Sequence, residues 1–427
     1  MPTTPPPPST TDVAAQVAVV SGVDSNVFVT QRSDGSAARH PAAFVGLEGS
    51  YGLRRAGRLA EEIKDVRVFG RLQQYAPLGP SFEGREGRVG LAWLGATRLG
   101  WRTMVTTTSI STLGSVQAAR GTDGAKVSFD PLSTRRTAWI TSNAAVLAHQ
   151  VSRAWLFARR VGVEIGGTVR DEVPGRAGSV HRGFDYIVGS TRTSLARRVS
   201  ARTTVEGALR LDRMHTAYVL DRSATPRNVG PLDSVSATFT LGAVHARTRA
   251  LTALGEAGVS LAVPRIGDPA LVLPAVSAGL VHATTSWSAS ALAGFQYAFT
   301  DPRVGPGPAS TVTLSLVGRP LGGAAHEDLY LIAEAAGQST KVVAGTNDGA
   351  RVDAGTASVE ARYNLGQGFG LLCGYDFRFG RFTGPSAPPP FVRHVVFLGL
   401  SLAWSGEGRI APMATLVRPT DPIPIGR

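Results

Sequence analysis

Apolar and polar residues alternate one for one along much of this chain. Residues 66–73, 204–212 and 371–379 show the pattern most plainly. Successive side chains of a β-strand point to opposite faces, so a period of two predicts strands with one apolar and one polar face. Helical periodicity is hard to find anywhere in the sequence. We therefore predict an all-β chain.

The alternation predicts eighteen strands, at residues 13–30, 41–54, 62–74, 87–94, 99–112, 135–148, 154–170, 183–195, 202–218, 233–246, 251–262, 272–283, 287–299, 311–318, 327–337, 357–364, 369–380 and 392–404. Connections after even-numbered strands are short, as at 95–98 and 196–201. Connections after odd-numbered strands are longer and rich in Gly, Pro and Asp, as at 113–134, 300–310 and 338–356. Loops sorted in this way predict a transmembrane antiparallel up-and-down β-barrel. A soluble sandwich would use Greek-key crossovers and would not sort its loops.

Large aromatic residues gather near the predicted strand ends. On the short-connection side lie Trp93, Trp101, Trp155, Trp287 and Trp404, and only Trp139 lies towards the other side. The opposite side carries Phe299, Phe377, Phe379 and Phe391. Two aromatic belts are expected where a barrel meets both membrane interfaces. They favour a location in the outer membrane, with membrane lipid around the barrel.

The barrel is predicted to cover residues 12–404, with an irregular segment at each end. Residues 1–11 form a disordered Pro/Thr-rich segment that lacks the basic start and apolar stretch of a secretory signal. Residues 405–427 carry four prolines and form a Pro-rich periplasmic tail.

The composition excludes several classes of protein. Hydrophobic residues make up 43% of the 427 residues, which is too much apolar surface for a disordered chain. Lys and Arg outnumber Asp and Glu by 44 to 31, but the arginines are scattered, so nucleic acid is not expected as a partner. The single cysteine, Cys373, excludes an intramolecular disulfide. The longest apolar run, Val395–Trp404, is about half of the roughly 20 residues that a membrane-spanning helix needs.

Patterns typical of catalysis or cofactor binding are missing from the sequence. No nucleophile elbow, zinc helix or phosphate-binding loop occurs. Asp212 and His215 could form half of a hydrolytic dyad, but their spacing puts them on opposite faces of a strand. The polar cluster at 326–328 lacks partners for a metal, and the loop with Asp348 and Asp353 has the composition of a turn. We therefore expect no enzyme, no cofactor and no metal site.

Ionisable residues on the polar phase of the strands would face the barrel interior. Eighteen strands enclose a lumen too wide for side chains to fill, so water is expected there. A charge inside the barrel must be hydrated or paired, because desolvating an unpaired ion is costly. These charges can pair and fix the wall, line a pore that favours anions, or do both. The predicted pore-lining residues are Arg67, Arg71, Arg88, Arg102, Arg160, Glu164, Arg192, Glu206, Arg210, Asp212, Glu360, Arg362, Asp376 and Arg378.

Two segments resemble parts of known outer-membrane proteins. Alternate residues of 396–404 form an unbroken apolar face, which resembles the C-terminal recognition strand of bacterial outer-membrane proteins. That resemblance implies the barrel-insertion machinery as a partner. The segment Ser21–Phe28 resembles the opening strand of many proteobacterial outer-membrane barrels, several of which belong to exopolysaccharide gene clusters.

The whole pattern over residues 12–404 is similar to the eighteen-stranded stand-alone porins of polysaccharide secretion in myxobacteria. This resemblance implies a porin that works with a periplasmic polysaccharide-export protein, and it carries over no catalytic residues. Our leading hypothesis is a porin that conducts exopolysaccharide through an Arg-lined aqueous lumen. The main alternative is a general diffusion porin for small anions, although the longest loop, 113–134, has only Asp123 and Asp130 as acids. A lipid-modifying barrel enzyme and a plugged structural or adhesive barrel are further alternatives.

Overall fold

The computed structural model describes residues 10–25, 30–31, 37–38, 41–56, 63–77, 84–99, 102–115, 135–173, 176–179, 186–217, 219–220, 228–229, 232–301, 305–319, 328–344, 348–383 and 390–405. The expectations for Trp101, Asp123, Asp130, residues 326–327 and most of both terminal segments fall outside these residues. Within the described part of the chain, no helix is long and apolar enough to cross a membrane.

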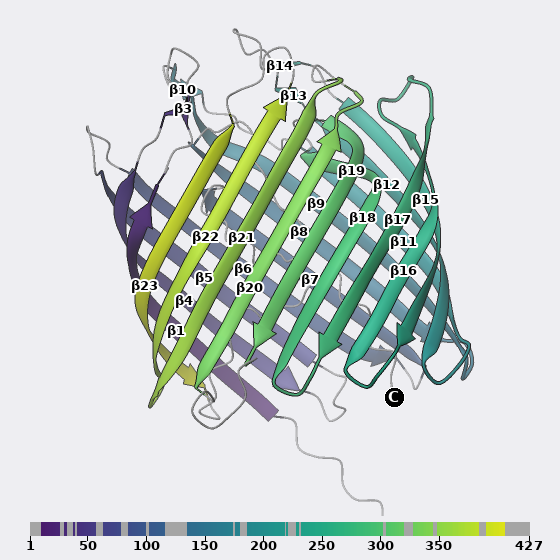
Figure 1. The fold of residues 1–427 in the computed structure, drawn as a ribbon, viewed down its shortest axis with the longest axis horizontal. Coiled ribbons are helices and arrows are strands. Elements are labelled where there is room, and N and C mark those ends of the chain that lie inside the picture. Colours follow the sequence, from purple (N-terminus) through teal and green to yellow (C-terminus); the bar gives the residue numbers. More distant parts are fainter. Residues whose placement is uncertain are drawn as a thin grey trace, which may run out of the picture.

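Eighteen antiparallel strands form a closed barrel, in which each strand pairs with its neighbours in chain order and the last pairs with the first (Figure 1). The barrel strands are β1 (Thr10–Asp24), β4 (Ala42–Ala56), β5 (Ile63–Pro77), β6 (Gly84–Leu99), β7 (Thr103–Ser115), β8 (Arg135–Gln150), β9 (Trp155–Val173), β11 (Tyr186–Arg198), β12 (Thr203–Thr216), β15 (Leu232–Ala246), β16 (Leu251–Val263), β17 (Leu271–Ala283), β18 (Trp287–Asp301), β19 (Gly305–Gly318), β20 (Leu329–Lys341), β21 (Arg351–Gly366), β22 (Phe369–Thr383) and β23 (Phe391–Ser405). The predicted all-β up-and-down barrel is confirmed.

The described part of the chain also contains five short strands. β2 (Thr30–Gln31) pairs with β3 (Ala37–Ala38), and β13 (Val219–Leu220) pairs with β14 (Asn228–Val229). β10 (Arg176–Ser179) pairs with the end of β9.

The two ends of the barrel differ in their connections. One end, the short-turn end, carries connections such as 151–154, 199–202 and 247–250, and the other is the long-loop end. Two connections depart from the predicted sorting. Residues 302–304 form a short connection at the long-loop end, and residues 319–328 form a longer one at the short-turn end.

The outward face of the barrel is apolar. Large hydrophobic side chains are exposed on it, among them Val19 (52% exposed), Leu241 (62%) and Leu400 (60%). Neighbouring strands present them together, as where Val19 lies opposite both Leu47 and Leu400. Such a band is unfavourable in water and is the surface that lipid covers in outer-membrane barrels. The chain therefore spans the outer membrane.

Aromatic residues lie near both edges of this band. Trp155 and Trp287 begin β9 and β18 at the short-turn end, where Trp404 lies next to the last residue of β23. At the long-loop end the rings of Phe377 and Phe379 have centroids 6.1 Å apart. Their positions are those expected of side chains at the two membrane interfaces.

The junction of the first and last strands is tightly packed on its inner side. A seam cluster on β1, β4, β5, β22 and β23 consists of Ala18, Val20, Ala42, Phe44, Tyr75, Leu372, Val395 and Phe397. Val20 is 0% exposed and Phe397 is 2% exposed. Glycine makes room for the large ring, because a Cβ on Gly374 would lie 2.2 Å from Cζ of Phe397.

The opening-strand segment fastens this junction. A Cβ on Gly22 would lie 2.1 Å from the carbonyl oxygen of Val396, so only glycine allows the strands to approach this closely. Nε of Arg393 donates to both carboxylate oxygens of Asp24, at 3.1 and 2.9 Å, in a fully buried ion pair. The Ser25 hydroxyl accepts a hydrogen bond from the amide of His394 at 2.8 Å. The part of this segment that the structure describes thus has a role in closing the barrel.

Candidate functional site on the inner wall

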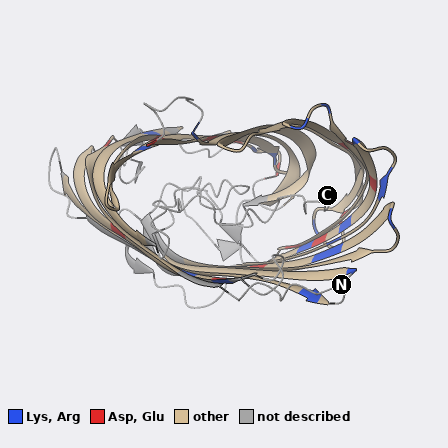
Figure 2. Ribbon diagram, turned by 90° about the horizontal axis from the view of Figure 1, so that it is seen from below, with Lys and Arg blue, Asp and Glu red and all other residues tan. Residues whose placement is uncertain are grey.

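Three arginines face the interior at one level of the wall. Arg192 of β11 lies directly opposite Arg160 of β9 and Arg210 of β12, and we call these three residues the arginine row. Their phase is opposite to that of Val161 and Leu209, which are exposed on the outer face. Seen from below, the wall that carries them encloses an elongated oval (Figure 2). Like charges placed opposite each other repel, and the charges of Arg192 and Arg210 both act on Arg160.

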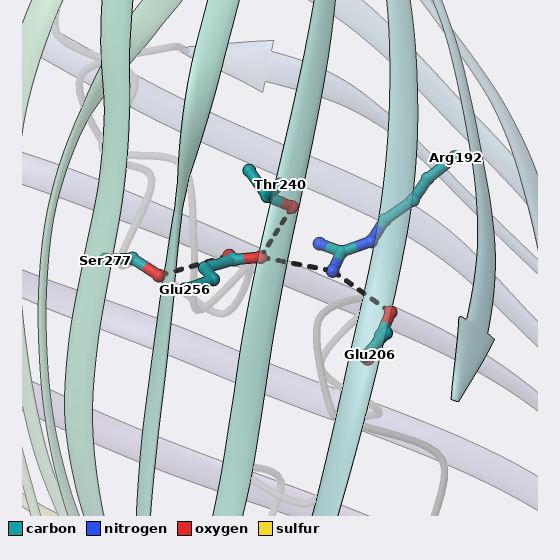
Figure 3. Close-up of polar contacts among 5 residues, drawn as sticks. All are labelled: Arg192, Glu206, Thr240, Glu256 and Ser277. Carbon is teal, nitrogen blue, oxygen red and sulfur yellow. Dashed lines mark hydrogen bonds and ion pairs between the residues drawn. The ribbon is translucent and has the colours of Figure 1, made fainter. Parts of the chain in front are cut away.

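Carboxylates from two other strands hold Arg192 along the wall (Figure 3). Its Nη2 donates to Oε1 of Glu206 at 3.2 Å and to Oε2 of Glu256 at 3.3 Å. Glu256 also accepts hydrogen bonds from the hydroxyls of Thr240 and Ser277, each at 3.1 Å. The network joins five neighbouring strands from β11 to β17 and leaves 40% of the Arg192 side chain exposed.

Two members of the arginine row, Arg192 and Arg210, are in described ion pairs, and Arg210 is the more exposed of these two. Its Nε lies 2.8 Å from Oδ2 of Asp212, two residues along the same face of β12. The Arg210 side chain is 45% exposed, whereas that of Asp212 is 6% exposed. On β9, Glu164 accepts a hydrogen bond from the Tyr186 hydroxyl at 3.3 Å. Here the carboxylate of Asp212 lies against the wall, and the guanidinium faces the lumen.

Four predicted pore-lining arginines lie elsewhere along the first strands. Arg67 donates to the two carboxylate oxygens of Asp65, at 3.1 and 2.9 Å. Arg71 and Arg88 lie opposite each other in the register of β5 and β6, and their side chains are outside the described residues. Arg102 precedes β7 in a turn, where its carbonyl accepts a hydrogen bond from the amide of Gln150 at 2.8 Å. Its backbone therefore lies at the short-turn rim, and its place along the lumen stays a prediction.

The predicted residues of the last strands face inward near the seam. Glu360 and Arg362 form an ion pair on β21, with side chains that are 14% and 19% exposed. On β22, Arg378 lies opposite Arg393 of the seam, and Asp376 lies opposite Val395. The partly buried Glu360–Arg362 pair joins two side chains of one strand, and the structure does not bring these residues together with the arginine row. That any of the fourteen residues lines a conducting pore stays a prediction.

The tip of the β18–β19 hairpin folds into the long-loop end. β18 pairs with β17 only as far as Phe295. Beyond that residue, Tyr297 shares a 3.0 Å hydrogen bond with Ser234 of β15. Phe299 packs against a buried mouth cluster of Met214, Leu232 and Ala344. Phe299 is therefore an interior residue and not part of the outer aromatic belt that its position in the sequence suggests.

A Gly-Pro run lets this hairpin meet the connection between β20 and β21. Gly305 has a φ of +124°, and a Cβ there would lie 2.9 Å from the carbonyl oxygen of Ala344. A Cβ on Gly307 would lie 1.8 Å from the carbonyl oxygen of Lys341. The run predicts a loop over 300–310, but β19 begins at Gly305, because glycine permits the close approach that the pairing with β18 and β20 requires.

Sequence reasoning missed the carboxylate that organises the arginine row. Glu256 lies on the polar phase of β16, within the predicted strand 251–262, so the alternation itself could have located it. Its contact with Arg192 could not be found in this way, because the two residues are 64 positions apart.

Within the described part of the chain there is neither a metal-binding cluster nor a serine opposite His215 in the sheet. No group of three or more His, Cys, Asp or Glu residues there is placed to hold a metal. Nδ1 of His215 lies 3.0 Å from Oδ1 of Asp233 on the outer face, while Asp212 faces inward. The register partners of His215 are Ile187 and Asp233, so no serine stands opposite it.

No known protein family and no characterised protein matches the sequence. Three solved structures are similar in fold. OpdQ from Pseudomonas aeruginosa is 8% identical, with a TM-score of 0.40 over 92% of this chain and 98% of that chain. The ferric-catecholate import receptor Fiu from E. coli is 9% identical, with a TM-score of 0.42 over 92% and 82%. OpdK from Pseudomonas aeruginosa, solved with vanillate, is 12% identical, with a TM-score of 0.37 over 92% and 98%.

All three TM-scores are below 0.5, so the assignment depends on the barrel itself. The apolar outer band, the closed sheet and the charged inner wall together make this chain a porin-like barrel of the outer membrane.

Proposed function

We propose that this barrel is a passive porin that conducts small anions past the arginine row. The observation that carries the proposal is the difference in exposure between the row and the carboxylate beside it, since Arg192 and Arg210 are 40% and 45% exposed and Asp212 is 6% exposed. A positive lining raises the local concentration of anions and favours their passage. Because Glu206 and Glu256 adjoin the row, we expect a modest selectivity.

The arrangement of the long-loop end favours a small solute over a polymer. A hydrogen bond between Tyr297 and Ser234 joins the tip of the β18–β19 hairpin to β15. The two strands of the β16–β17 hairpin lie between β15 and β18 in the sheet. Phe299 and the mouth cluster hold the same tip against the inner wall of β12 and β15. A hairpin that folds inward narrows the lumen at that end. Small ions pass a narrow lumen more easily than a polymer does.

Single-channel recording of the refolded protein in a planar bilayer tests the proposal. Under a salt gradient, the reversal potential should show a preference for the anion. Arg192→Gln should lower that preference and Glu256→Gln should raise it, whereas Arg213→Gln, on the outer face, should leave it unchanged. The proposal would be contradicted if the folded protein does not conduct. It would also be contradicted if Arg192→Gln and Glu256→Gln both leave the anion preference unchanged.

Export of polysaccharide is a second candidate. It is favoured by the opening-strand segment Ser21–Phe28 and by the arginine row, whose positive charge attracts an acidic polymer. An acidic polysaccharide added at the short-turn side should then block the single-channel current, and deleting the gene should reduce surface polysaccharide. Unchanged surface polysaccharide in the deletion strain would contradict this candidate and leave the anion porin intact.

A further inference from the structure

The short-turn end carries exposed arginines on three neighbouring turns. Turns 151–154, 199–202 and 247–250 contain no Asp or Glu. Their arginines, which we call the arginine rim, are Arg153, Arg202, Arg247 and Arg249. All four are exposed, and among the described residues none is in an ion pair. These three turns therefore present positive charge that no described acidic residue pairs with.

Two more arginines project from the outer face just above these turns. Arg159 is exposed on β9 and shares the outward phase of Val161. Arg197 of β11 lies opposite Trp155, with its guanidinium carbon 5.4 Å from the ring centroid. Thr193, also on β11, lies opposite Arg159. Arg197 thus lies at the level of Trp155, at the boundary between the apolar band and the turns. Arg159 lies four residues further along β9, beyond the exposed Leu195.

A charge in this position needs a partner from the membrane. An arginine on the lipid face is tolerated near the headgroups and becomes more costly towards the bilayer centre. Tryptophan rings settle at the headgroup level, so Trp155 marks that level beside Arg197. The flexible stem of Arg159 lets its guanidinium reach along the wall towards the same level. A guanidinium binds phosphate oxygens through two parallel hydrogen bonds, which makes a lipid phosphate the complementary group.

Two other exposed arginines have partners within the protein. One is adjacent to Arg197 in sequence, and the other lies near the long-loop end. Arg198, next in sequence to Arg197, donates to the carbonyl oxygens of Ser200 and Ala201 at 3.3 and 3.4 Å and so holds its own turn. Arg213, on the outer face near the long-loop end, lies 3.5 Å from Oδ1 of Asp233. The protein itself supplies an acidic partner for Arg213, whereas no acidic residue in the described part of the chain pairs with Arg159 or Arg197.

We infer that Arg159, Arg197 and Trp155 form a binding site for the phosphate of an anionic phospholipid in the leaflet at the short-turn end. The positively charged arginine rim attracts anionic phospholipids to the barrel wall in that leaflet. The site lies on the outer wall, so it does not depend on what passes through the lumen.

Native mass spectrometry of the folded barrel measures this binding directly. The barrel is released from mixed micelles that contain phosphatidylglycerol and phosphatidylcholine in equal amounts. The wild-type protein should retain phosphatidylglycerol in preference to phosphatidylcholine. Arg159→Gln and Arg197→Gln should each weaken that binding about fivefold, the effect of removing one arginine beside an anionic surface. Arg213→Gln is the matched control and should bind as the wild type does.

Charge-conserving variants separate binding from folding. Arg159→Lys and Arg197→Lys keep the charge and should keep most of the preference for phosphatidylglycerol, and a heat-modifiability gel checks that every variant is folded. Folded Gln variants that retain the full preference overturn the inference. Displacement of the bound lipid by millimolar inorganic phosphate also overturns it, because the site would then belong to a soluble anion.

Discussion

The seam and the arginine row both place charge on the inner wall, but they use it differently. At the seam, Asp24 is 0% exposed and Arg393 is 5% exposed, and the seam cluster packs beside them. In the row, Arg192 and Arg210 keep 40% and 45% of their side chains exposed. A buried ion pair is costly to break, whereas an exposed one contributes little to stability. The seam charges therefore hold the barrel closed, while the exposed charges of the row can contact a solute.

The largest expected effect is at the seam ion pair. Asp24→Ala should lower the free energy of unfolding by about 3–5 kcal/mol, because it leaves Arg393 buried without its counter-charge. Urea titration of the folded barrel in lipid vesicles measures the change. Replacing both partners, Asp24→Leu with Arg393→Met, should cost less than Asp24→Ala alone. A loss below about 1 kcal/mol would mean that the seam charges behave like surface charges.

Overpacking the seam should have the next largest effect. In Gly374→Ala the new Cβ would meet Cζ of Phe397 at 2.2 Å, so we expect a loss of about 1–3 kcal/mol in the same titration. Gly189→Ala on β11 is the matched control, because nothing lies within 4 Å of its Cβ position. Equal effects of the two variants would show that Phe397 moves aside without cost.

Breaking the hydrogen bond at the tip of the β18–β19 hairpin should have an intermediate effect on stability. Tyr297→Phe removes the hydrogen bond to Ser234 and should cost about 1 kcal/mol. Loosening the hairpin tip should also raise the single-channel conductance or its fluctuations, which a bilayer recording shows. Ser234→Ala should change the conductance in the same way, although it also removes the 3.1 Å hydrogen bond to the carbonyl of Val263, and the double variant should add little to that change. Unaltered conductance in all three variants would mean that the tip does not narrow the pore.

The smallest effect on stability is expected at the row. Arg192→Gln leaves Glu256 its hydrogen bonds from Thr240 and Ser277, so the loss should stay below about 1 kcal/mol. Its effect on selectivity should be clearer, a fall of about two- to fivefold in the anion-to-cation permeability ratio, as expected for one hydrated charge close to the ion path. A large loss of stability with unchanged selectivity would place Arg192 with the seam residues.

Much of the site could be predicted because the face of the sheet to which a side chain points depends only on the local alternation along its strand. The polar phase of predicted strands located Arg160, Arg192 and Arg210 on one face without knowledge of their neighbours. The same reasoning gave the wrong environment for Phe299, since the alternation holds only while a strand stays in the wall. It also gave no sign that Glu256 would reach Arg192 across two intervening strands.

The sequence by itself determined the barrel class, the outer and inner faces and the sorting of most loops. These follow from the period-two geometry of the extended chain and from turn chemistry, which act over a few residues. Only the tertiary structure decided which charges meet, which hairpin folds inward and how the ends join. Asp24 and Arg393 are 369 residues apart in sequence and become partners because closure pairs β1 with β23. Such contacts depend on the register between strands, which no local pattern specifies.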